Sequence, residues 1–193
     1  MCKVLYIKAN ASKEEKSNTF MLSDNFVNEY KKYHPNDEIT TIDLNKERIR
    51  SLTRNDMLSA IANKKDESKN HPVLKYAYQF AEADKYIVAE PLCNSGIPAI
   101  LNYIDYVSIM DIAFKHTDYG SVGLLKGKKA VNIVSRNGED YSESFCFNEL
   151  GQDYLKTIFS FFGITDFITI NADQLSSAED EASHVTQEKA KVF

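Results

Sequence analysis

Five short runs of apolar and β-branched residues recur along the chain and are predicted to be strands. They are residues 3–8, 38–44, 86–90, 129–135 and 166–171. The first, third and fourth runs have nearly continuous apolar centres, which is typical of parallel strands covered on both faces. The sequence therefore predicts a parallel sheet that is buried between two layers.

Stretches with helical spacing of apolar residues separate these runs. Helices are predicted over residues 20–33, 73–83, 97–113 and 147–162, and a surface helix over residues 177–192. Gly163 follows the fourth of these, as a glycine often does at the end of a helix. A polar excursion interrupts the alternation at residues 45–71, with one helix expected near residues 55–63. Alternating strands and helices predict an α/β fold with right-handed crossovers, formed by residues 1–193 as a single domain.

Five parallel strands allow two arrangements, a flavodoxin-like order 2-1-3-4-5 or a truncated Rossmann order. Both place a ligand at the carboxyl ends of the strands, where the strand order reverses. The loops after strands one, three and four are therefore the places to look for a site.

Composition and charge exclude several classes of protein. The chain has 193 residues, is 43% hydrophobic and carries a net charge of −5, so nothing favours nucleic acid. No apolar run approaches the length of a membrane span, and the N-terminal MCKVLYIK does not resemble a signal peptide. The three cysteines are odd in number and widely spaced, which favours a reducing compartment. We expect a cytoplasmic protein. The four histidines never stand at metal-ligand spacing, so no metal is expected.

The loop after strand one leads into a helix that begins near Ser17, Asn18 and Thr19. Neither GxGxxG nor GxxxxGK[ST] is present, which weighs against a Rossmann NAD site and against ATP or GTP. Free N–H groups and the positive end of the helix dipole favour a phosphate at such a position. The alternative is that one of these residues is an ordinary N-cap.

The loop after strand three reads IVAEPLCNSGIP and lies between two prolines. Pro91 ends the strand, and Pro98 suits the first turn of the next helix. Between them the backbone offers N–H and C=O groups that could pair with the edge of a flat heterocycle. A plain strand-to-helix connection is the alternative. It explains Pro98 well but explains less well an apolar Leu92 and Cys93 in an exposed loop.

The loop after strand four combines a cation, a turn and an aromatic residue. Arg136 is a candidate anion contact, Gly138 permits positive φ, and Tyr141 is a candidate aromatic cover. The alternative is that Asn137-Gly138 is a common turn. Three donor-rich loops at one edge of a sheet make a stronger case for a single crevice than any one of them does alone.

At this point the chain resembles the FMN-dependent NADH azoreductases, which are flavodoxin-fold quinone and azo reductases of bacteria. The stretches that carry the resemblance are KVLYIKAN, SNT, HPNDEITTIDL, EPLCNSGIPAILNYIDYV, FKHTDYGSVGLLKGKKAVNIVSRNG and YLKTIFSFFGITDFITI. The resemblance implies a three-layer sandwich of strand order 2-1-3-4-5 with helices on both faces. It also implies non-covalent FMN held by Asn10, Ser17, Asn18, Thr19, Pro91, Leu92, Cys93, Asn94, Ser135, Arg136, Asn137 and Gly138.

The chain departs from the family at three of these loop positions. Cys93 stands where the family usually has Tyr or Trp, Ser95 where it often has Phe, and Asn137 where it usually has Gly. The backbone contacts to the flavin can survive such changes. Aromatic packing over the ring cannot, so the departures bear on substrate choice.

The activity that the resemblance implies is ping-pong transfer of a hydride from NADH to the flavin and then to a quinone or azo compound. No side chain is required as a catalytic acid, and Phe114, His116, Tyr119 and Tyr141 are the candidates on the substrate side. A homodimer with sites at its interface is expected from the family and from the frequency of two-fold dimers. The residues proposed for that interface, which could equally be core, are Tyr103, Tyr106, Val107, Ile109 and Met110.

Three other functions stay open on the sequence. A flavodoxin-type electron carrier would share the fold and FMN but would need no NADH. A phosphodiesterase acting on acyl carrier protein was once ascribed to relatives, although the sequence offers no nucleophile–base pair or metal cluster for it. The third alternative is a binding module without flavin.

Overall fold

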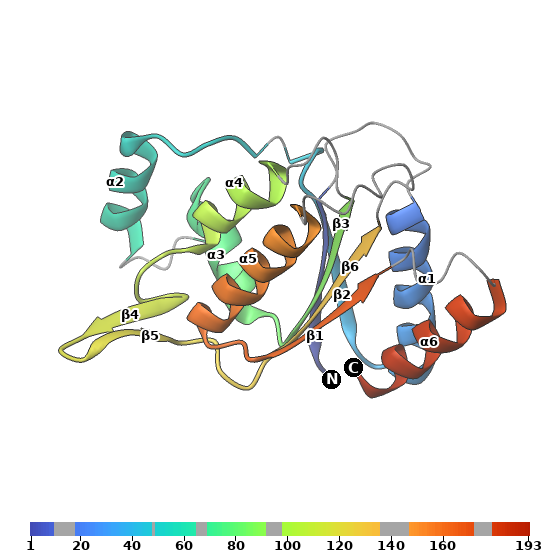
Figure 1. The fold of residues 1–193 in the computed structure, drawn as a ribbon. Coiled ribbons are helices and arrows are strands. Elements are labelled where there is room, and N and C mark those ends of the chain that lie inside the picture. Colours follow the sequence, from blue (N-terminus) through green and yellow to red (C-terminus); the bar gives the residue numbers. More distant parts are fainter. Residues whose placement is uncertain (10–17, 48, 65–68, 92–97, 136–146, 172–178) are drawn as a thin grey trace.

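A five-stranded parallel sheet lies at the centre of the molecule (Figure 1). The computed structural model describes residues 1–9, 18–47, 49–64, 69–91, 98–135, 147–171 and 179–193. The strands in spatial order are β2 (Glu38–Asp43), β1 (Lys3–Lys8), β3 (Lys85–Pro91), β6 (Lys129–Ser135) and β7 (Asp166–Asn171). Counted among themselves, these strands have the order 2-1-3-4-5. The predicted flavodoxin-like sheet is confirmed.

Helices cover both faces of this sheet, which gives three layers (Figure 1). On one face lie α1 (Asn18–Tyr33) and α6 (Glu179–Val192). On the other lie α3 (Leu74–Glu82), α4 (Pro98–Val107) and α5 (Phe147–Phe162), while α2 (Arg54–Asn63) sits farther out beside α4.

The central strands are buried because successive residues face opposite layers. In β1, Val4 and Tyr6 belong to the core beneath α1 and α6, whereas Leu5 and Ile7 belong to the core beneath α3, α4 and α5. Side chains alternate across a strand, so a run that is apolar at every position needs a cover on each side.

Aromatic rings fill the core beneath α3 and α5. Phe80 of α3 stacks on Tyr86 of β3 at a centroid distance of 4.3 Å, and Phe159 of α5 meets Phe80 edge-on at 5.6 Å. Such pairs add to the stabilisation that their buried area already provides. These contacts hold both helices against the same strand.

The predicted helix over residues 97–113 is too long, because α4 ends at Val107. The Ser108 hydroxyl bonds back to the Ile104 carbonyl at 2.7 Å, and Asp111 has a φ of 66°, which helices do not use. The apolar periodicity continues past the helix because Ile109 and Ala113 are still core residues. The apolar spacing after Val107 therefore indicates buried residues and not a continued helix.

The predicted surface helix at the end of the chain is buried along one side in its described part. Ala190 and the following Phe193 lie in the core beneath α1, and the ring of Phe193 is 5.9 Å from those of both Phe26 and Tyr30. The Ala, Glu and Lys composition did not reveal this docking, because few apolar residues are needed to cover a helix that already presents aromatic rings.

A two-stranded antiparallel hairpin, which the sequence did not predict, follows α4. Its strands are β4 (Phe114–Thr117) and β5 (Gly120–Gly123). A Cβ atom on Gly123 would lie 2.2 Å from the backbone carbon of Phe162, so the base of the hairpin packs directly on the end of α5. Helices of this fold run from the carboxyl edge of the sheet back to its amino edge. The hairpin therefore sits at the amino edge.

Replacing Gly123 with Ala is expected to destabilise the fold by about 1–3 kcal/mol, because the new methyl group overlaps backbone that cannot move aside. Urea denaturation followed by circular dichroism measures the loss. Gly127→Asn is the matched control, since Gly127 has open space and a φ of 75° that Asn tolerates. Equal stability of the two variants would contradict the packing of the hairpin on α5.

Candidate functional site

The carboxyl ends of β1, β3 and β6 lie side by side at one edge of the sheet. Lys8 pairs with Ala89, and Pro91 pairs with Ser135. The Ala9 N–H extends the first pairing by bonding to the Ala89 carbonyl at 2.9 Å. The chain leaves β1 toward β2 on one side and reaches β3 on the other, so the strand order reverses at β1. This junction is where a doubly wound sheet binds its ligand.

Helix α1 is tied to β1 by a partly buried polar network near this edge. Lys8 Nζ lies 2.7 Å from Asp24 Oδ1, and Tyr6 Oη donates to the same carboxylate oxygen at 2.9 Å. Tyr6 Oη also shares a hydrogen bond of 2.6 Å with Ser23 Oγ. Burial raises the pKa of Tyr6 well above its usual range, so its phenol stays a donor. The network fixes the first turns of α1 against the strand.

As a result, the N-terminus of α1 lies at the carboxyl edge, beside the strand ends. The helix begins at Asn18, and Thr19 is fully buried. Backbone N–H groups in the first turn of a helix have no partner within the helix, and the dipole makes this end positive. The arrangement can accept a phosphate without a cationic side chain.

Two buried polar side chains lie beneath the same edge, and the sequence reading missed both. Glu90 is 1% exposed and Asn132 is 0% exposed. Neither the carboxylate oxygens of Glu90 nor the amide atoms of Asn132 have a hydrogen-bond partner among the described residues. Asn132 pairs with Val88, so both side chains point toward the layer of α3, α4 and α5.

The environment of Glu90 favours its neutral form. Burial raises the pKa of its carboxyl group to about 7, and the nearby Asn132 amide opposes the shift only in part. The signal for both residues was present in the sequence. Each interrupts an otherwise apolar strand, in YIVAE and in KAVNIVS. A charged or amide residue inside a strand that is buried on both faces is a candidate for function.

Replacing Glu90 with Gln is expected to change how stability depends on pH. Because the folded pKa of about 7 exceeds the ordinary value of 4.5, the unfolded chain releases its proton first as pH rises. The wild type therefore loses about 3 kcal/mol relative to Glu90→Gln between about pH 4.5 and pH 7. Urea titrations of the flavin-free protein across this range measure the difference. A constant difference would mean that Glu90 does not titrate as a buried acid.

The structure places four of the predicted cofactor residues at this junction. Asn18 and Thr19 begin α1, Pro91 is the last residue of β3 and Ser135 is the last residue of β6. The other predicted contacts lie outside the described residues, namely Asn10, Ser17, Leu92, Cys93, Asn94, Arg136, Asn137, Gly138 and Tyr141. The strand ends from which those loops depart do converge, whereas the loop contacts themselves stay predictions.

The hairpin carries three of the predicted substrate-side residues. The ring of Phe114 lies 4.9 Å from that of Phe161, and His116 Nδ1 shares a hydrogen bond of 2.9 Å with Ser121 Oγ. Tyr119 is fully exposed at the tip. Because the hairpin lies at the amino edge, one chain does not bring these residues to its own strand ends (Figure 1).

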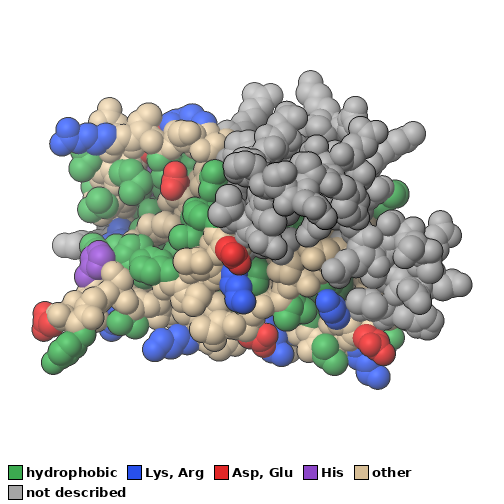
Figure 2. All heavy atoms as spheres, in the orientation of Figure 1, with side chains coloured by type: hydrophobic (Ala, Val, Ile, Leu, Met, Phe, Trp, Pro, Cys, Tyr) green, Lys and Arg blue, Asp and Glu red, His purple; other side chains and the backbone are tan. Residues whose placement is uncertain are grey.

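Four of the five residues proposed for a dimer interface are core residues, namely Tyr103, Tyr106, Val107 and Ile109. Met110 is exposed. Other exposed hydrophobic residues lie on α2, α4 and α5, and Figure 2 shows hydrophobic side chains between α2 and the hairpin. We call this surface the apolar side. Its members are Leu58, Ile61, Leu101, Met110 and Phe161.

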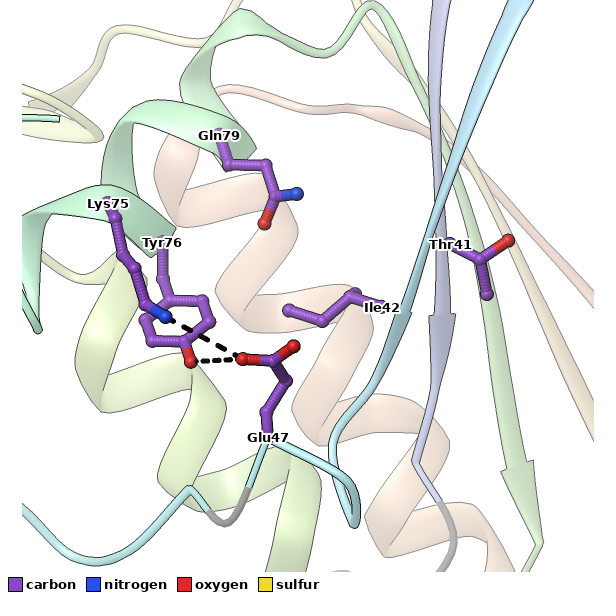
Figure 3. A pocket seen from close by; sticks show the side chains of 6 residues that line it. All are labelled: Thr41, Ile42, Glu47, Lys75, Tyr76 and Gln79. Carbon is purple, nitrogen blue, oxygen red and sulfur yellow. Dashed lines mark hydrogen bonds and ion pairs between the residues drawn. The ribbon is translucent and has the colours of Figure 1, made fainter. Parts of the chain in front are cut away.

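A hollow of about 230 Å³ opens between the outer strand β2 and α3 (Figure 3). The charged and phenolic groups that line it already pair with one another. Tyr76 Oη donates to Glu47 Oε2 at 2.6 Å, and Lys75 Nζ lies 3.7 Å from the same oxygen. The hollow lies along the outer strand rather than at the reversal of strand order. We assign no ligand to it.

Within the described ranges, no group of three or more His, Cys, Asp or Glu side chains is arranged to hold a metal ion. Along the same parts of the chain, no helix has both the length and the apolar character needed to cross a membrane.

The doubly wound sheet, the reversal at β1 and the helix N-terminus beside it define a flavodoxin-like protein. A family model described as the flavodoxin-like fold matches residues 2–192. The chain belongs to this family.

Individual relatives show the same similarity over the full length. The chain is 54% identical over 196 residues to an FMN-dependent NADH:quinone oxidoreductase 2 of Clostridium acetobutylicum, with 99% of this chain and 97% of the relative covered. An azoreductase structure from Bacillus anthracis strain Sterne superposes with a TM-score of 0.79 at 32% identity, covering 100% of both chains. An FMN-dependent NADH-azoreductase from Bacillus anthracis strain Ames Ancestor, in complex with FMN, gives a TM-score of 0.80 at 25% identity, covering 98% of each chain.

Proposed function

We propose that the chain is an FMN-dependent NADH oxidoreductase that reduces quinones and aromatic azo compounds by two-electron, ping-pong hydride transfer. The observation that carries the proposal is the N-terminus of α1 beside the adjacent ends of β3 and β6, in a chain whose relatives bear these activities in their names. The whole chain acts as one domain in the cytoplasm.

The described residues fit FMN at this junction. The first turn of α1, at Asn18 and Thr19, would hold the phosphate through backbone N–H groups, and the ion pair of Lys8 with Asp24 keeps that helix in place. Pro91 and Ser135 pair with each other, so the loops that follow them start side by side and can line the two sides of a flat ring. The flavin supplies the hydride chemistry, and the chain supplies binding and orientation.

We also propose a homodimer in which the hairpin of one subunit completes the site of the other. The support is geometric. Phe114, His116 and Tyr119 lie at the edge opposite their own strand ends, and the side chain of Tyr119 is fully exposed. The apolar side offers the surface that a second copy would bury.

Replacing Ile61 with Lys is expected to weaken the dimer at least about tenfold, because an unpaired charge would be buried in the contact. Ile61 is 59% exposed on α2, so the change should not disturb the core. Sedimentation equilibrium measures the association. Val192→Lys is the control, since Val192 is 73% exposed on α6, which covers the opposite face of the sheet. A wild-type monomer, or an Ile61→Lys variant as dimeric as the control, would refute this interface.

The proposed activity predicts a yellow protein that NADH bleaches without oxygen and a quinone restores. Visible spectra of the purified protein before and after each addition measure this. A yellow protein that NADH leaves unchanged would instead favour an electron carrier. A colourless protein that takes up no added FMN would favour a binding module. Phosphodiester hydrolysis by the flavin-free protein would favour the hydrolase.

A further inference from the structure

The buried pair of Glu90 and Asn132 has no role in the fold as described, and its position relates it to the proposed flavin site. Glu90 directly precedes Pro91, where β3 ends and the loop predicted to line the flavin begins. Asn132 lies on the adjacent strand β6, and its register partner Val88 is two residues before Glu90. Both side chains therefore lie on the side of α3, α4 and α5, Glu90 one residue before the end of β3 and Asn132 three residues before the end of β6.

Burying a carboxyl group without hydrogen-bond partners lowers the stability of a fold. A buried group of this kind therefore suggests a role other than stability. Glu90 is 1% exposed, and no hydrogen-bond partner for either oxygen is found among the described residues. Asn132 acts on the carboxyl group from nearby, although the two side chains do not meet the geometry of a hydrogen bond. The pair thus has unused donor and acceptor capacity directly below the junction.

Charged neighbours do not explain the protonation of Glu90. The titratable groups on the elements packed over this face include Tyr76 of α3, Tyr103 and Asp105 of α4, and Asp153, Tyr154 and Lys156 of α5. None of them contributes to the raised pKa of Glu90, which follows from burial and is opposed only by Asn132. Lys8 of β1 is on the other face, where Asp24 pairs with it. The carboxyl group can therefore respond to a charge that arrives from the site above.

We propose that Glu90 is a proton-exchanging residue of this site, which takes up a proton when negative charge enters at the ends of β3 and β6 and releases it when that charge leaves. The proposal rests on the proposed function. Glu90 acts from beneath the binding surface, so it tunes the site without touching a substrate. Asn132 sets the range of pH over which it does so.

The proton balance of the proposed reaction explains why a proton-exchanging Glu90 would be useful. NADH delivers one hydride, which carries two electrons and one proton, and leaves as NAD⁺. The site then holds one extra negative charge, and Glu90 changes from carboxylate to carboxylic acid by taking one proton from water. When a quinone leaves as a hydroquinone, it has gained that hydride and one further proton from solvent, and Glu90 releases its own proton to solvent as the charge leaves. One NADH and one proton are consumed for each quinone.

The expected coupling is large enough to measure. Two like charges within about 8 Å in a protein interior shift an ionisation equilibrium by about tenfold or more. The pKa of Glu90 lies near 7 before any charge is added, so the residue is poised where a further rise changes its protonation at physiological pH.

The test compares the FMN-loaded wild type with Glu90→Gln, which keeps the shape and polarity of the side chain but cannot titrate. Anaerobic reduction with one equivalent of NADH, in weak buffer with a pH-indicator dye, measures proton uptake at about one pH unit above the pKa of Glu90. The wild type should take up at least about 0.4 of a proton more per site than Glu90→Gln, because a tenfold shift raises the protonated fraction of Glu90 from about 0.1 to about 0.5 at that pH. As pH rises over the same range, the midpoint potential of the bound flavin should fall more steeply in the wild type than in Glu90→Gln. The difference in slope should be up to about 30 mV per pH unit, which for two electrons is a tenfold change in the equilibrium constant.

Three further variants separate this role from a structural one. Glu90→Asp keeps a titrating acid and should restore uptake. Asn132→Val removes the amide that favours the charged form, so it should move the uptake to higher pH. Glu82→Gln is the matched control. This glutamate lies at the end of α3, where it pairs with Lys3 at the amino edge, and its loss should leave the uptake unchanged.

The outcomes distinguish this proposal from the one on which it rests. Equal proton uptake and equal potential slopes in FMN-loaded wild type and Glu90→Gln would overturn the role of Glu90 while leaving the flavin enzyme intact. The same loss of uptake in Glu82→Gln would also overturn it. Failure of the wild type to bind FMN or to react with NADH would overturn both proposals. If Glu90→Gln folds poorly, an absence of excess proton uptake in the wild type alone refutes the role.

Discussion

The pairing of β1 with its two neighbours is the constraint on which the rest of the structure depends. β1 pairs in parallel with β2 on one side and with β3 on the other, so successive crossovers must leave in opposite directions. Crossovers between parallel strands are right-handed, and opposite directions therefore place α1 on one face and α3 on the other. The two connections diverge at the carboxyl edge of β1. The strand order alone therefore produces a crevice at that edge, whatever side chains line it.

The side chains then divide the sheet into regions with different tasks. Apart from Asn132 in the middle of β6, the interiors of the central strands carry mainly apolar groups, and aromatic rings such as Phe80, Tyr86 and Phe159 hold the helices against them. Near the carboxyl edge the pattern changes. On one face the charges of Lys8 and Asp24 are paired and tie down a helix, while on the other Glu90 and Asn132 are buried without such pairing. The unpartnered groups lower the stability of the ligand-free protein at this edge, as at many functional sites. A bound ligand would restore that stability.

The sequence revealed those parts of the fold that depend on local pattern. The five strands and the helices between them follow from apolar periodicity, and Gly163 ends α5 with a φ of 98°, as a terminating glycine does. The hairpin was missed because its strands are four residues long and its exposed positions, including His116 and Tyr119, look like a polar loop. Glu90 was missed for a related reason. A glutamate at the end of a predicted strand suggests a return to solvent, and only the helices packed over it show that it is buried. The loops of the candidate site were predicted from topology rather than from pattern, and their contacts stay predictions because the loops lie outside the described residues.

The position of the hairpin in the fold bears on whether the proposed site needs residues from a second chain. Gly123 fixes the base of the hairpin to the end of α5, at the edge of the sheet that the proposed ligand does not use. A hairpin held there extends away from its own chain, and its exposed tip cannot fold back without breaking that contact. The apolar side begins beside it, on α2 and after α4, where the paired Lys64 and Asp111 link the two segments. In the proposed dimer, a two-fold axis through this surface would carry each hairpin toward the other copy. The contact of Gly123 with α5, which keeps Phe114, His116 and Tyr119 away from their own strand ends, would then bring them to the site of the partner.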